Sequence, residues 1–287
     1  MIKKEDKTSH SLQIPKGILY TSRFLEAIST KLTTLFAAKL FATPIKHKIP
    51  KREWNMNRNS IQSTIKIPKI GKEIVIYEYG KSSKKVLLVH GWSGRGTQLY
   101  KIADALIENG YSTISFDAPA HGKSKGNKTL MPEFMACILE IEKHFAPFEF
   151  AIGHSLGGMA ILNALKQNFT INKAIIIGSG DVIQDIIDDF VKKIGLNHKI
   201  GIKLKEYYEK KYGEPMEDYG SSFVSKDISQ PILIIHDKND DDVDVKAAYQ
   251  INKSLKNSQL MITEGLGHRK ILGDKIVIEN SIKFLKE

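Results

Sequence analysis

From Ile61 onward the chain alternates between segments with the pattern of a β-strand and segments with the pattern of an α-helix. Strand patterns occur at residues 84–91, 111–118, 148–153, 173–180, 231–237 and 259–265. Several of them are continuous apolar runs, which are typical of strands covered on both faces. Segments with helical periodicity lie between or after them, at residues 97–110, 130–145, 156–167, 245–255 and 275–286. Strands that alternate with helices favour right-handed crossovers. The sequence therefore predicts an α/β fold with a mostly parallel, doubly wound sheet.

Two segments depart from this alternation. Residues 61–67 and 73–80 are separated by Pro68 and Gly71 and predict an antiparallel hairpin at the start of the sheet. The fifty residues between two later strands are too long for a loop and hold two or three helical patterns rich in Tyr and Phe. We therefore expect a small helical cap there. The predicted organisation is an N-terminal arm (1–60), a core domain (61–180 and 231–287) and a cap insertion (181–230).

The N-terminal arm is strongly basic. It contains twelve Lys or Arg and four Asp or Glu, and so carries most of the net charge of +11. Apolar residues recur in it at helical spacing, namely Leu25, Ile28, Leu32, Leu35 and Phe36, and Pro44 follows the expected end of this helix. A basic amphipathic helix suits the surface of an anionic membrane; the alternatives are packing on the domain or on a second subunit of a homo-oligomer. Nucleic-acid binding is not expected, because the arm lacks interleaved stacking aromatics.

Composition limits the compartment. Cys137 is the single cysteine, so no intrachain disulfide can form, which fits a reducing compartment. The chain shows neither a signal-peptide pattern nor an apolar run of membrane-spanning length. We therefore expect a soluble, cytoplasmic protein.

Two serines fit the pattern G-x-S-x-G. Ser155 follows a buried strand pattern and directly precedes a helix, whereas Ser124 lies in a polar, lysine-rich loop. A serine becomes an effective nucleophile on a tight strand-to-helix turn that exposes its hydroxyl. Ser155 is therefore the predicted nucleophile, with a helix-capping serine as the alternative, and Ser124 is predicted to be a turn residue.

A serine on such a turn requires an acid and a histidine later in the chain. His268 is the histidine in the loop after the last strand, and we predict it to be the general base. The acid is predicted in the aspartate-rich loop after residue 236, with Asp240 favoured, Asp241 next and Asp242 third. His90, His154 and His236, which lie at or near strand ends, are expected to be core residues or to support the site.

The other aspartates of this loop, Asp237 among them, are expected to be solvated surface charges. A calcium loop would need glycine at its sixth position and glutamate at its twelfth. Counted from Asp240, these positions hold Val245 and Ile251, so no metal is predicted.

Acyl transfer also requires backbone N–H groups that stabilise an oxyanion. One comes from the residue after the nucleophile and one from a loop after an earlier strand. Leu156 is the predicted first donor and Trp92 the predicted second. The indole of Trp92 is expected either to wall the acyl pocket or to fill the core.

Five motifs, taken in order, resemble the α/β-hydrolase superfamily in its serine-nucleophile branch: VLLVHGWSG, FDAPAHGKS, GHSLGG, IHDKND and GLGHRK. The resemblance covers residues 61–287. It implies a triad of Ser155, His268 and Asp240, an oxyanion hole at Trp92 and Leu156, and a cap at 181–230. FDAPAHGKS resembles a structural turn of this family, which implies that Ser124 is not the nucleophile.

The predicted activity is hydrolysis of a small carboxylic ester through an acyl-enzyme, with no cofactor. A thioesterase or an acyltransferase would use the same residues with another leaving group or acceptor. A non-catalytic binding protein on the same scaffold is the alternative from a different class.

Overall fold

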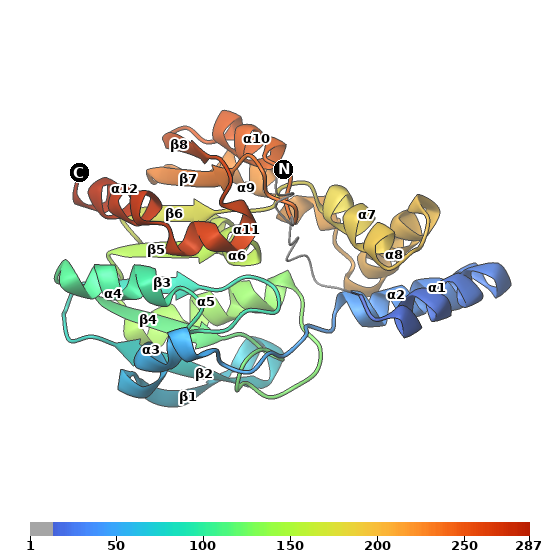
Figure 1. Cartoon of the computed structure of the whole chain (residues 1–287), viewed down its shortest axis with the longest axis horizontal. Coiled ribbons are helices and arrows are strands. Elements are labelled where there is room, and N and C mark those ends of the chain that lie inside the picture. The colour runs from blue at the N-terminus through green and yellow to red at the C-terminus, as the bar shows by residue number, and fades with distance from the viewer. Residues whose placement is uncertain (1–13) are drawn as a thin grey trace, which may run out of the picture.

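The computed structural model describes residues 14–287 (Figure 1), so residues 1–13 of the predicted arm lie outside the described part of the chain. Its strands are β1 (Ile61–Ile67), β2 (Lys72–Tyr79), β3 (Lys85–Val89), β4 (Ser112–Asp117), β5 (Phe150–His154), β6 (Lys173–Ile177), β7 (Ile232–Asp237) and β8 (Ser258–Thr263). Its helices are α1 (Lys16–Ile28), α2 (Thr30–Phe41), α3 (Trp54–Asn59), α4 (Tyr100–Glu108), α5 (Met131–Phe145), α6 (Leu156–Lys166), α7 (Ile183–Lys193), α8 (His198–Tyr212), α9 (Ser221–Ser225), α10 (Lys246–Ser254), α11 (Gly267–Lys270) and α12 (Lys275–Lys286).

The strands form one eight-stranded sheet in the order β1-β2-β4-β3-β5-β6-β7-β8. The β1–β2 and β2–β4 pairs are antiparallel, and every other neighbouring pair is parallel. The predicted mostly parallel sheet and its N-terminal hairpin are therefore confirmed.

Helices cover both faces of the sheet because its central strands are apolar on both sides. In β3, Leu87 and Val89 pack into the cluster that includes α5 and α6. Val86 and Leu88 point the other way, into the cluster that includes α4 and α12. Residues two apart on a strand share a face, so an uninterrupted apolar run fills two cores at once. The result is the doubly wound arrangement that the sequence predicts.

A helical lobe projects from one end of the sheet and combines segments far apart in sequence. It contains α1 and α2 from the arm with α7 and α8 from the stretch after β6 (Figure 1). Ala37 and Ala38 of α2 share an apolar cluster with Ile187 and Val191 of α7 and Leu204 of α8. Within residues 14–287, no helix has both the length and the apolar character needed to cross a bilayer.

The arm differs from its prediction in one respect. The single expected helix is two helices joined at Ser29, whose extended backbone (φ −158°) interrupts the first helix. The Ser29 hydroxyl then accepts a hydrogen bond from the Leu32 N–H and caps α2, which is the role that serine favours before a helix. The helix-like spacing of apolar residues across this joint therefore does not correspond to one buried face.

Candidate active site

Ser155 lies on the tight turn between β5 and α6. Its backbone adopts φ 53° and ψ −119°, a region that non-glycine residues rarely occupy and that costs about 1–3 kcal/mol. The turn is held because the Ser155 N–H donates to the carbonyl of Ile177 at 2.9 Å. Glycine is required at position 157, where a Cβ would lie 2.3 Å from the carbonyl oxygen of Val89. The motif thus allows α6 to begin directly against β3.

His268 and Asp240 meet at the same edge of the sheet, from the loops after β8 and β7. Their side chains are joined by a 2.7 Å hydrogen bond between Nδ1 of His268 and Oδ2 of Asp240, whose side chain is 1% exposed. Burial alone would raise the pKa of Asp240. The hydrogen bond and charge of His268, with the N–H groups of Val243 and Asp242, outweigh burial and place that pKa below its ordinary value. Asp240 is therefore ionised at neutral pH.

The other two candidate acids lie elsewhere in the loop. Asp241 is exposed. Asp242 is half-buried and pairs with Arg269 and with Lys193 of α7, each at 3.4 Å. Among the three, Asp240 is the aspartate that contacts His268.

Asp237 was expected to be a solvated charge, and this prediction is wrong. Its side chain is fully buried and accepts hydrogen bonds from the Asn239 N–H (2.9 Å), the Thr263 hydroxyl (2.7 Å) and the Leu266 N–H (3.0 Å). Burial favours a raised pKa, but these donors more than compensate and lower it. Because its donors come from both loops, Asp237 ties the loop that carries Asp240 to the loop that leads to His268.

Two of the three histidines at strand ends support these loops. The Nε2 of His154 lies 2.8 Å from the carbonyl oxygen of His268, and the two rings are 4.6 Å apart. Burial, followed by the proximity of His268, holds the pKa of His154 well below 6.5, so His154 is neutral and donates to that carbonyl. His236 is fully buried, and its Nε2 lies 2.9 Å from the carbonyl oxygen of Val243, in the turn that follows Asp240.

The two predicted oxyanion donors lie at neighbouring turns. Leu156 is the first residue of α6, and Trp92 lies in the loop after β3. A Cβ at Gly91 would be 3.0 Å from the Cβ of Ser155, so the loop after β3 packs directly on the serine turn. Neither N–H is hydrogen-bonded to another group within residues 14–287. Both are therefore available to a ligand.

Neutral histidines fix the loop that carries Trp92. Nε2 of His121 accepts from the Ser93 N–H at 3.0 Å, and Nε2 of His90 accepts from the Ala118 N–H at 3.0 Å. Burial lowers the pKa of His90 to about 4. Burial, followed by the proximity of His90, lowers the pKa of His121 to about 3. The indole of Trp92 packs edge-on to His121.

Ser124 has a different environment. It is 1% exposed, its hydroxyl donates to the carbonyl of Asp117 at 2.6 Å, and it accepts from the Val75 N–H at 2.9 Å. A hydroxyl with both roles filled inside the protein has no free access to a substrate. Its surroundings are those of the predicted turn residue.

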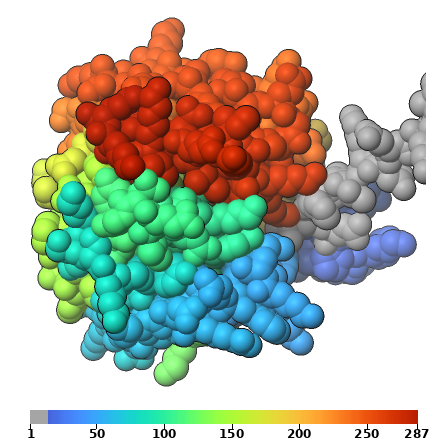
Figure 2. Space-filling model, turned by 60° about the vertical axis from the view of Figure 1, so that its left-hand side comes forward, coloured from blue at the N-terminus to red at the C-terminus, as the bar shows by residue number. Residues whose placement is uncertain are grey.

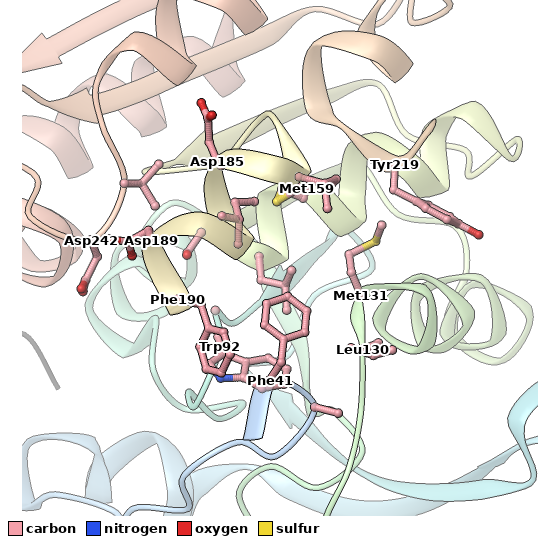
Figure 3. Close-up of a pocket in the computed structure, with 18 of the residues that line it drawn as sticks. Phe41, Trp92, Leu130, Met131, Met159, Asp185, Asp189, Phe190, Tyr219 and Asp242 are labelled. Carbon is pink, nitrogen blue, oxygen red and sulfur yellow. The ribbon is translucent and has the colours of Figure 1, made fainter. Parts of the chain in front are cut away.

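Ser155, His268, Asp240, Trp92 and Leu156 all line one cavity of about 1510 Å³. Apolar side chains form much of its wall, and Figure 3 shows Phe41 and Phe190 beside Trp92, with Met159 above them. The two phenyl rings meet edge to face with centroids 5.1 Å apart. Asp185, Asp189 and Asp242 lie on another side of the cavity (Figure 3), so one part is apolar and another is charged.

The arm was not predicted to lie at this cavity. Phe41 and Ala38 of α2 line it together with residues of α7 and α8. The apolar segment just before Pro44 was the available signal, but its periodicity alone does not identify what it packs against.

Comparison with known proteins comes from sequence and from structure. Residues 80–198 match the family model described as serine aminopeptidase, S33. An esterase from Pyrococcus furiosus superposes with a TM-score of 0.65 and 17% identity, over 85% of this chain and 97% of that one. An esterase from Exiguobacterium antarcticum superposes with a TM-score of 0.63 and 19% identity, over 79% of this chain and 100% of that one. A membrane phospholipase A superposes with a TM-score of 0.62 and 14% identity, over 95% of this chain and 100% of that one.

No curated protein is similar enough in sequence to count as a relative. The solved structures share the fold at low identity, and the family model matches the segment from the end of β2 to the start of α8, which includes the Ser155 turn. Sequence match and architecture agree with the resemblance inferred from the five motifs. The chain has the fold of these α/β hydrolases, and its residues 80–198 are similar to the serine aminopeptidase S33 family.

Proposed function

We propose that this protein is a serine hydrolase that cleaves carboxylic esters of apolar acyl groups through an acyl-enzyme on Ser155. The observation that carries the proposal is the hydrogen bond between His268 and the buried carboxylate of Asp240, in the cavity that Ser155 lines. A buried acid, an imidazole and a serine on a strained turn are the parts that nucleophilic acyl transfer requires.

In the proposed reaction, Nε2 of His268 takes the proton of the Ser155 hydroxyl as the oxygen attacks the ester carbonyl. Asp240 accepts from Nδ1, which fixes the imidazole tautomer and stabilises the imidazolium that forms. The tetrahedral intermediate collapses when His268 protonates the leaving alcohol. His268 then activates water, which releases the carboxylic acid and restores the serine.

The N–H groups of Leu156 and Trp92 serve as oxyanion donors in this scheme. Their lack of other acceptors in residues 14–287 supports that role. His121 is the supporting group, because its bond to the Ser93 N–H fixes the residue next to Trp92. Loss of one such donor typically costs about 10²–10³ in rate.

The wall of the cavity supports an apolar acyl group. Phe41, Met159 and Phe190 line it near Trp92, and buried apolar surface favours hydrocarbon by about 25 cal/mol per Å². The volume of about 1510 Å³ is large for a small-molecule site. The presence of two esterases and a phospholipase among proteins with this fold is in keeping with such a substrate.

The test is hydrolysis of p-nitrophenyl esters of increasing acyl length, with matched thioesters, by the wild type and by Ser155→Ala. We expect kcat/KM to rise from acetate to longer chains and Ser155→Ala to lower kcat by about 10⁴-fold or more. Preference for the thioesters would reassign the leaving group. Undiminished ester hydrolysis by Ser155→Ala would refute the proposal.

A further inference from the structure

The two arm helices expose a row of large apolar side chains, spaced along residues 20–35. We call this row the arm face: Tyr20 (69% exposed), Phe24 (66%), Ile28 (61%), Leu32 (49%) and Leu35 (42%). The first three are spaced four residues apart and so lie on one side of α1. Soluble proteins scatter such residues singly, and a contiguous group marks a surface that contacts something else.

The arrangement within α2 is the reverse of what packing on the core would give. The helix buries Thr33, Thr34, Ala37 and Ala38, while Leu32 and Leu35 face outward. Burying the threonines leaves no unpaired hydroxyl, because Thr33 donates to the Ser29 carbonyl and Thr34 to the Thr30 carbonyl, each at 2.8 Å. On that inner side, the Tyr208 hydroxyl of α8 donates to the Ala38 carbonyl at 2.7 Å. Leu32 and Leu35 are therefore left largely uncovered by the described part of the chain.

The arm helices that carry the arm face are also rich in basic residues. Residues 14–48 contain six Lys or Arg and one acid, Glu26, which already accepts a hydrogen bond from the Asn197 N–H. Lys16, Arg23, Lys31 and Lys39 are exposed, and in the part of the chain that the structure describes no carboxylate forms an ion pair with them. The surface thus combines apolar side chains with unneutralised positive charge.

The arm face is continuous with the wall of the active-site cavity. Leu35 lines the cavity and is also exposed on the outside, and Ala38 and Phe41 continue the wall inward along α2. In Figure 1, α1 is the outermost element of the helical lobe, and in Figure 2 it stands clear of the rounded surface of the core.

We propose that the arm face docks on the surface of an anionic lipid bilayer, with Tyr20, Phe24 and Ile28 inserted among the acyl chains and the lysines of the arm helices on the lipid headgroups. Amphipathic helices with a basic polar side bind membranes in this way. Charge decides against a second copy of the chain. A two-fold dimer through this face would bring two sets of unneutralised lysines together. Docking goes beyond ester hydrolysis and does not depend on it.

The experiment is co-sedimentation of the full chain with vesicles of phosphatidylcholine alone or mixed with phosphatidylglycerol. We expect binding to the mixed vesicles, weaker binding to phosphatidylcholine, and release at high salt, where charges are screened. Tyr20→Ser/Phe24→Ser/Ile28→Ser should weaken binding about tenfold or more. These three residues lie outside the cavity lining, so the variant should hydrolyse a soluble short-chain ester like the wild type.

The matched control is Ile61→Ser/Tyr249→Ser/Ile276→Ser, which removes apolar residues of similar exposure scattered over the core. This variant and Ser155→Ala should bind mixed vesicles like the wild type. Because vesicle binding does not require ester hydrolysis, the experiment distinguishes failure of the docking proposal from failure of the hydrolase proposal. Absence of wild-type binding, or equal loss in both triple variants, would overturn the docking proposal. A wild-type dimer that the arm variant converts to monomer, without vesicle binding, would assign the face to a second copy.

Discussion

Asp237 and Asp240 stand three residues apart and have different surroundings. Asp240 contacts His268, whereas Asp237 accepts hydrogen bonds from Thr263, Leu266 and Asn239 and joins two loops. Both carboxylates have lowered pKa values because nearby donors outweigh burial. One loop thus supplies both the proposed acid of the triad and the group that fixes the loop.

The proposed acid can be tested by replacing one aspartate at a time. Asp240→Asn should lower kcat for a p-nitrophenyl ester by about 10⁴-fold, because the amide no longer holds the required imidazole tautomer. Asp242→Asn is the matched control, since Asp242 pairs with Arg269 and Lys193 rather than with His268. A larger loss in the Asp242 variant would place the acid elsewhere in the loop.

At the scale of single residues, the sequence was informative where a local pattern determines the environment. The strand before Ser155 and the helix after it distinguish this serine from Ser124, and the distinction needs no long-range information. The burial of Asp237 depends on Thr263 and Leu266, more than twenty residues away. No local signal separates it from the exposed Asp241 in the same aspartate-rich loop.

Among the elements, the segment after α2, residues 42–53, contacts the active-site loop that follows β3, and we call this segment the strap. The Ile45 N–H donates to the Ser93 hydroxyl at 2.9 Å, and the Ala42 carbonyl accepts from the Thr129 N–H at 2.9 Å. The strap ends at Glu53, whose carboxylate forms two hydrogen bonds with Arg95, of 2.6 and 2.7 Å. The arm therefore contacts the loop that carries Trp92 as well as the cavity.

Because the strap ends at the buried ion pair between Glu53 and Arg95, we expect loss of this pair to lower the stability of the protein strongly. Glu53→Gln leaves the Arg95 charge buried without its partner and should lower the free energy of unfolding by about 3–5 kcal/mol, measured by urea denaturation. Glu264→Gln is the control, because the pair of Glu264 with Lys238 is exposed and should contribute less than about 1 kcal/mol. Equal effects in the two variants would contradict the assigned role of Glu53.

Across the whole molecule, the alternation of strand and helix patterns sufficed to predict the sheet. Each βαβ unit is local in sequence, and right-handed crossovers leave few arrangements. The arm was harder, because its two helices pack against α7 and α8, more than 140 residues away. Periodicity predicts which side of a helix is apolar but not whether that side is covered, and in α2 the covered side holds threonines and alanines.

Buried histidines also make the stability of the whole molecule depend on pH. The pKa values of about 4 for His90 and about 3 for His121 lie below the ordinary 6.5 because burial disfavours the charged ring. Between pH 6.5 and about 4 the unfolded chain binds more protons. Stability is therefore complete above pH 6.5 and falls as the pH drops, by about 1.4 kcal/mol per pH unit for each histidine.

Urea denaturation of the wild type and of His121→Asn at several pH values between about 7 and 5 would measure this dependence. The variant should be less stable than the wild type at every pH. Its stability should also fall less steeply as the pH drops, with a slope smaller than that of the wild type by about 1.4 kcal/mol per pH unit. Parallel curves would show that His121 does not titrate on unfolding.

Reaction with a fluorophosphonate, followed by peptide mass spectrometry, shows which serine of this protein is the nucleophile. We predict one adduct, on Ser155, that is retained in Ser124→Ala and lost in Ser155→Ala. An adduct on Ser124, or labelling that survives Ser155→Ala, would show that Ser155 is not the nucleophile.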